Sequence, residues 1–103
     1  MWAQIIKVRL KPGMDDRVAG LLEQLRATEQ PGSGLLRTTA MRDDNDPACI
    51  WMMVVFDSEE SARAREHDPR REEGLTAARA TMAEILDGPP EFIDLTVVEE
   101  TNW

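Results

Sequence analysis

The chain has a single histidine, a single cysteine and no tyrosine among its 103 residues. The one cysteine, Cys49, cannot form an internal disulfide, and a transition-metal site would lack a plausible set of His and Cys ligands. The sequence also contains no Gly-rich phosphate loop and no Ser-His-Asp arrangement. We therefore expect no disulfide scaffold, no bound metal and no cofactor.

Positive charge is scarce as well, because 12 Lys and Arg residues stand against 20 Asp and Glu residues, for a net charge of −8. Nucleic-acid binding depends largely on clustered Lys and Arg, so we expect no nucleic-acid partner. No apolar run approaches the roughly 20 residues that span a bilayer. No basic segment followed by a hydrophobic block opens the chain. We therefore expect no membrane association, no signal peptide and a cytoplasmic location.

The most informative segment that the chain does contain is the unbroken apolar run Ile50–Phe56. A run without alternation predicts a strand that is buried on both faces. Asp57 and Glu60 fit a variant of the helix capping box, so a helix is predicted to begin directly after this strand. That helix should stop near Pro69, because proline disfavours helix in the residue before it.

The length favours one domain that covers residues 1–103. Apolar alternation bounded by turn residues predicts strands at residues 2–11, 35–42, 48–56 and 91–100. Helical spacing of apolar residues predicts helices at residues 14–30, from 58 to about 69, and onward to about 86. The order β-α-β-β-α-β predicts a ferredoxin-like α+β fold with a four-stranded antiparallel sheet. Right-handed crossovers would place both helices on one side, and the first and third strands in the centre.

The opposite face of this sheet is predicted to be too apolar to stay in water. By alternation its members include Leu35, Trp51, Met53, Val55 and Phe92. Monomers rarely expose an apolar patch of that size, and packing against a second copy about a two-fold axis would cover it. We therefore predict a homodimer, with the last four of these residues in its interface.

Several short motifs carry further information: the strand-to-helix junction Phe56–Ala62 and the segments Lys11–Met14, Pro31–Leu35, Asp46-Pro47, His67–Pro69 and Leu86–Pro90. These motifs resemble those of the antibiotic biosynthesis monooxygenase family of dimeric α/β barrels. The junction is the best match, and the resemblance covers nearly the whole chain.

This resemblance implies a substrate pocket between the helices and the sheet, and cofactor-free oxygenation of an aromatic, polyketide or quinol-type molecule. The alternative is a non-catalytic protein of the same fold that binds a hydrophobic small molecule or serves as an accessory subunit. The Asn, Trp and His of the haem-degrading branch fall at Ile6, Arg65 and Leu75 here, so haem degradation is not expected. The expected pocket residues are Ile6, Val8, Met52, Phe56, Leu75 and Met82.

Two polar residues are candidates for catalysis, and each has a plainer explanation. Arg65 lies one helical turn after Ser61 and could stabilise a substrate anion, or it could pair with surface glutamates. His67 could accept a proton near neutral pH, or it could simply occupy the exposed end of a helix.

Overall fold

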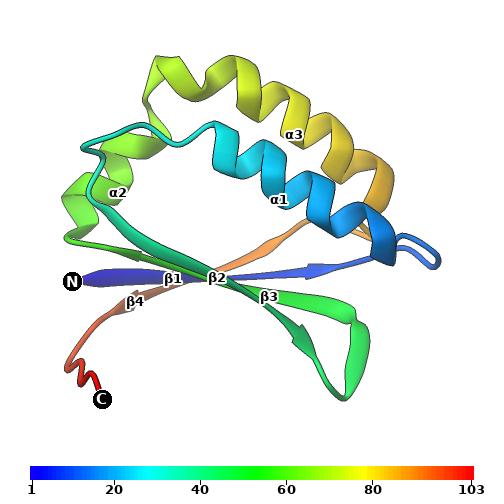
Figure 1. Ribbon diagram of the computed structural model, residues 1–103, viewed down its shortest axis with the longest axis horizontal. Coiled ribbons are helices and arrows are strands. Elements are labelled where there is room, and N and C mark those ends of the chain that lie inside the picture. Colours follow the sequence, from blue (N-terminus) through cyan, green and yellow to red (C-terminus); the bar gives the residue numbers. More distant parts are fainter.

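The computed structural model describes residues 1–103 as a four-stranded antiparallel sheet with all helices on one face (Figure 1). The strands are β1 (Trp2–Arg9), β2 (Leu35–Asp43), β3 (Asp46–Phe56) and β4 (Glu91–Thr96). Their order in the sheet is β2-β3-β1-β4, so the predicted central position of the first and third strands is confirmed. The fold is the ferredoxin-like α+β arrangement that the order of elements predicts.

The helical layer consists of α1 (Val18–Ala27), α2 (Glu59–Glu66) and α3 (Glu72–Ile85). Short 3₁₀ turns, η1 (Asp15–Arg17) and η2 (Pro69–Arg71), precede α1 and α3. Helix α2 is capped by Ser58 rather than by Asp57, because the Ser58 hydroxyl accepts a hydrogen bond from the Ser61 N–H at 3.1 Å. None of the three helices combines the length and the apolar character that crossing a bilayer requires.

The buried side chains form two separate clusters between the helices and the sheet. The larger cluster joins β1 and β3 to α1 and α3, and includes Val8, Ile50 and Ile85. The smaller cluster lies under α2 and consists of Trp2, Val54, Phe56 and Ala62. Ile6 packs against both clusters from the central strand, so the space between them lies over the middle of the sheet.

The strand register corrects two of the predicted face assignments. Phe92 was expected on the outer face, but it pairs with Ile6, whose side chain faces the helices, and so Phe92 faces them too. Ile93 and Leu95 therefore occupy the outer face. Leu35 also lies on the helix side, where it packs on the smaller cluster. An irregularity in β2 between Leu35 and Arg37 is the cause, because it reverses the alternation of side chains there.

Candidate functional site

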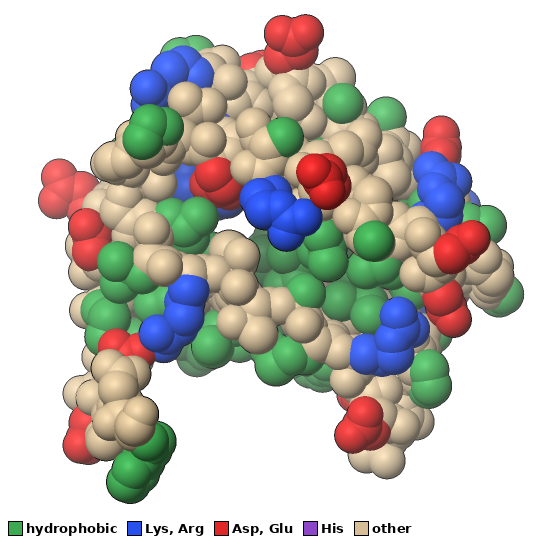
Figure 2. All heavy atoms as spheres, viewed as in Figure 1, with side chains coloured by type: hydrophobic (Ala, Val, Ile, Leu, Met, Phe, Trp, Pro, Cys, Tyr) green, Lys and Arg blue, Asp and Glu red, His purple; other side chains and the backbone are tan.

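A cavity of about 730 Å³ lies between the sheet and the helices, over the gap that separates the two core clusters. Figure 2 shows it as a hollow with hydrophobic side chains on its inner walls and charged side chains at its rim. The volume falls within the range of about 300–1,000 Å³ that is typical of small-molecule sites. The apolar walls come from both layers: Trp2, Ile6, Leu22, Leu25, Leu35, Met52, Val54, Phe56, Ala62 and Leu75.

The open side of the cavity follows from the composition of β2, the edge strand on that side. Its helix-facing residues Thr38 and Ala40 are exposed, because their short side chains do not pack against the helices. Helices α1 and α3 pack against one another over the larger cluster, while α2 covers the smaller one. The sheet between them is left accessible from the β2 edge.

Four of the six predicted pocket residues line this cavity: Ile6, Met52, Phe56 and Leu75. Val8 does not, because it is a buried member of the larger core cluster. Met82 packs against that same cluster and lines a second, shallower cavity beside Pro89 and Pro90. Phe92, which was predicted for the dimer interface, lines both cavities and is 60% exposed.

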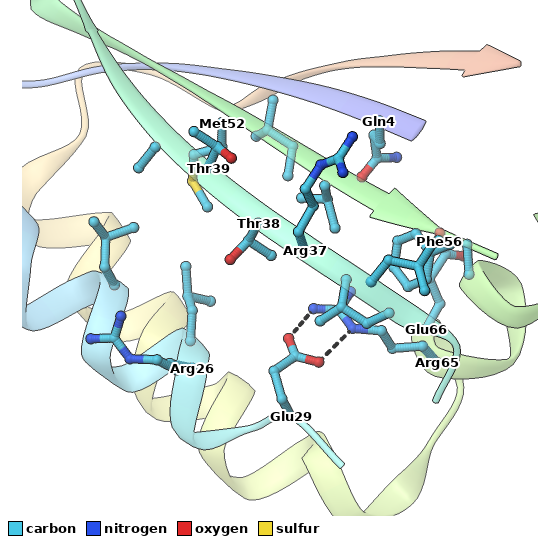
Figure 3. Close-up of a pocket in the computed structure, with 18 of the residues that line it drawn as sticks. Gln4, Arg26, Glu29, Arg37, Thr38, Thr39, Met52, Phe56, Arg65 and Glu66 are labelled. Atoms are coloured by element: carbon cyan, nitrogen blue, oxygen red, sulfur yellow. Dashed lines mark hydrogen bonds and ion pairs between the residues drawn. The ribbon is translucent and has the colours of Figure 1, made fainter. Parts of the chain in front are cut away.

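Arg65 reaches the cavity but is already paired. Its Nε donates to a Glu29 carboxylate oxygen at 2.9 Å, and its Nη2 contacts the other oxygen in the same carboxylate (Figure 3). The guanidinium also lies over the Phe56 ring, 5.3 Å from the ring centroid. The structure thus brings Arg65 and Phe56 together as predicted, but the cation shares its charge with Glu29.

His67 does not line the cavity. It is exposed and forms the C-terminal cap of α2. Its backbone N–H donates to the Ala64 carbonyl, as expected where a helix ends. His67 therefore occupies the exposed end of a helix, the alternative to a catalytic role that its position in the sequence suggested.

Arg71 is a polar residue of the cavity that was not predicted from the sequence. Its neighbour Arg70 is exposed and pairs with Asp68, whereas Arg71 is 5% exposed and lines the cavity. Burial, reinforced by the nearby charge of Arg65, lowers the pKa of Arg71 from its usual range. The spacing in the sequence indicates its inward position, because Arg71 precedes Leu75 by four residues and Ala78 by seven. Residues at this spacing share the face of α3 that points toward the sheet.

The turn that positions Arg71 gives a prediction about acid stability. The Asp68 carboxylate accepts hydrogen bonds from the side chain and backbone N–H of Arg70, which lowers the pKa of Asp68 from 3.8 to about 2. A depressed folded-state pKa means that the stabilisation is present above about pH 4 and is lost as the pH falls toward about 2. Asp68→Asn should therefore lower urea stability at about pH 6 and have little effect at about pH 2. Asp16→Asn, at an exposed carboxylate without an ion pair, is the control. Equal losses for Asp68→Asn at both pH values would contradict the assignment.

Sequence and fold comparisons place the chain among known proteins. Residues 1–77 match the family model for antibiotic biosynthesis monooxygenase. A protein from Chloroflexus aurantiacus that is named for the same family is 27% identical, with 98% of this chain and 96% of that chain covered, at a TM-score of 0.69. No protein of curated function matches the chain.

The cofactor-independent oxygenase SnoaB from Streptomyces nogalater is similar in fold, with a TM-score of 0.74. It is 17% identical, and 96% of this chain and 94% of that chain are covered. A Caulobacter crescentus protein named for the same family has a TM-score of 0.76 at 16% identity, over 95% of this chain and 90% of that chain. At these identities the similarity concerns the fold alone.

Proposed function

The chain belongs to the antibiotic biosynthesis monooxygenase family, and we propose that its cavity binds an aromatic or quinol-type small molecule and directs its oxidation by molecular oxygen without a bound cofactor. The observation that carries this proposal is the apolar cavity of about 730 Å³ between sheet and helices, with guanidinium groups at one end. A flat aromatic molecule fits walls such as Phe56 and Met52, and the cations favour its deprotonated form.

For an anthrone-type substrate, the reaction converts a ring methylene into a ketone. The substrate loses a proton from the methylene carbon, and the resulting anion supplies the electrons that reduce oxygen. One oxygen atom becomes the ketone oxygen, and the other leaves as water with the two hydrogens of the methylene. The protein contributes shape, exclusion of water and positive charge that lowers the energy of the substrate anion.

The second candidate is a binding protein of the same fold that performs no reaction. Its support is specific: His67 lies outside the cavity, and the Arg65 charge is taken up by Glu29. No side chain with an ordinary pKa near neutrality therefore lines the cavity to accept the substrate proton. The two candidates differ in whether a bound substrate consumes oxygen.

Oxygen uptake with an anthrone decides between them. We expect one oxygen consumed per anthraquinone formed, and label from ¹⁸O₂ in the new ketone. Ala40→Trp should abolish this activity, because Ala40 is exposed at the mouth of the cavity, where an indole would block entry without crowding the core. Ala77→Trp, at an exposed position on α3 away from the cavity, is the matched control and should retain activity. Anthrone binding without oxygen uptake above the buffer rate would refute the oxygenase and favour the binding protein.

We also propose that the protein is a homodimer that packs through the outer face of the sheet. Ile93 and Leu95 are 47% and 43% exposed on this face, which also includes the half-buried Met53 and Trp51 on β3. Val55 lies on the same face but is only 3% exposed, so a partner can cover little more of it. Figure 1 shows that the β2–β3 hairpin and the C-terminal segment extend on this side, away from the helices.

A further inference from the structure

We infer that the cavity contains an anion-binding subsite at Arg71, so that its ligand carries an acidic group on an apolar, aromatic body. The inference deepens the proposed function and rests on it in one respect, namely that a small molecule occupies this cavity. The ligand class that follows is an aromatic carboxylate, or an aromatic molecule with an equally acidic hydroxyl group.

The first support is that Arg71 is buried with incomplete partners. Its Nη1 donates to the Arg65 carbonyl at 3.1 Å, and its Nη2 donates to the Thr28 hydroxyl at 3.2 Å. Both acceptors are uncharged, and the Nε atom is buried with no acceptor at all. Buried charges in proteins are normally paired, so this guanidinium lacks a counter-ion of its own.

The second support is the charge count at this end of the cavity. The nearest carboxylate to Arg71 is Glu29, at 3.7 Å, and that carboxylate already accepts two contacts from Arg65. Glu66 also lines the cavity, but its carboxylate pairs with Arg63. Arg65 and Arg71 therefore share the one carboxylate of Glu29. Each of the other lining arginines has an acidic partner: Arg26 with Glu23, Arg37 with Glu100, and Arg79 with Glu72.

The excess positive charge stands out because the chain as a whole carries a net charge of −8. An acidic protein that places two guanidinium groups around one carboxylate beside an apolar cavity favours ligands that bring the missing negative charge. The ring of such a ligand would lie against Phe56, Met52 and Ile6, with its acidic group toward the Arg65–Glu29–Arg71 cluster. Glu29 opposes this anion, and its removal should therefore strengthen binding.

Calorimetric binding of two matched probes tests the inference: anthraquinone-2-carboxylate and its neutral carboxamide. The unaltered protein should bind the carboxylate at least about tenfold more tightly, since a charge-assisted hydrogen bond is worth about that factor or more. Arg71→Gln should abolish the preference, and Glu29→Gln should increase it. Arg17→Gln removes an exposed charge that pairs with Glu84 outside the cavity, and it should leave the preference unchanged. If Arg71→Gln does not fold, the probe pair and Glu29→Gln still decide the question.

Equal affinities for the two probes in the unaltered protein, or a failure of both to bind, would overturn the anion subsite. A preference that weakens in Glu29→Gln would overturn it too. The oxygen assay with anthrone, which carries no carboxylate, judges the proposed function separately. A strong carboxylate preference without oxygen uptake would support the subsite and refute the oxygenase.

Discussion

Gly34→Ala should lower the free energy of unfolding by about 2–5 kcal/mol, because it adds left-handed backbone strain to a steric clash. The Gly34 φ angle is +83°, and an added Cβ would lie 2.5 Å from the Ser61 Oγ and 2.6 Å from an Asp57 oxygen. The added Cβ would also lie 2.6 Å from the Ser61 Cβ, which cannot rotate away. Ser61 is held in place because its hydroxyl and its N–H both bond the Ser58 cap. A loss of this size is a large share of the roughly 5–15 kcal/mol of a typical domain.

Gly32→Ala separates the two causes. Gly32 has a similar φ of +77°, but nothing lies within 4 Å of its added Cβ. It should therefore lose only the backbone term of about 1–2 kcal/mol. Urea denaturation of both variants at neutral pH measures the difference. Similar losses of unfolding free energy in the two variants would mean that the chain can shift at the contact between Gly34 and α2 at little cost. The close approach of Gly34 to Ser61 would then be unimportant for stability.

Element order and the central strands could be predicted because they depend on local patterns. The apolar run of Ile50–Phe56 has the composition of a central strand, and Pro69 does separate α2 from α3 as expected. Three of the cavity residues could be predicted for the same reason, since alternation in β1 and β3 places Ile6, Met52 and Phe56 on the helix side. The fourth, Leu75, lies on the apolar stripe of α3.

The faces of β4 could not be predicted by the same means. Phe92, Ile93, Leu95 and Val97 put apolar side chains on both faces, so alternation alone does not say which face meets the helices. Only the pairing of Ile6 with Phe92 settles it. In β2, an irregularity of one residue beside Leu35 reversed the face, and no turn residue marks it in the sequence.

The polar side of the cavity depends on contacts between residues far apart in the chain. Glu29 lies 36 residues before Arg65, and Thr28 lies 43 residues before Arg71. In sequence, Arg70 and Arg71 belong to one charged segment that fits a solvated, salt-bridged helix face, and only the helical spacing of Arg71 from Leu75 distinguishes the two. Tertiary packing separates them, because the 3₁₀ turn Pro69–Arg71 directs Arg70 toward solvent and Arg71 toward Thr28 at the C-terminal end of α1.

Met53→Glu should convert the proposed dimer into folded monomers at micromolar concentration. Met53 lies on central strand β3, between Ile5 and Thr39, in the middle of the outer face. A stable interface there would bury more than about 1,200 Å² in total. Each symmetric dimer would then bury two carboxylates without partners in an already acidic protein. Trp51→Glu should act in the same direction, but it also removes contacts of the indole with Asp43 and Lys7 within the chain.

Phe92→Glu is the matched control, since it introduces the same charge at an exposed apolar residue on the opposite face of the sheet. Light scattering coupled to size exclusion should give the dimer mass for Phe92→Glu and the unaltered chain, and the monomer mass for Met53→Glu. Circular dichroism should show that all three are folded. A monomer mass for the unaltered chain would refute the dimer outright. Dissociation by Phe92→Glu with Met53→Glu still dimeric would instead place the interface on the helix side of the sheet, at its β4 edge.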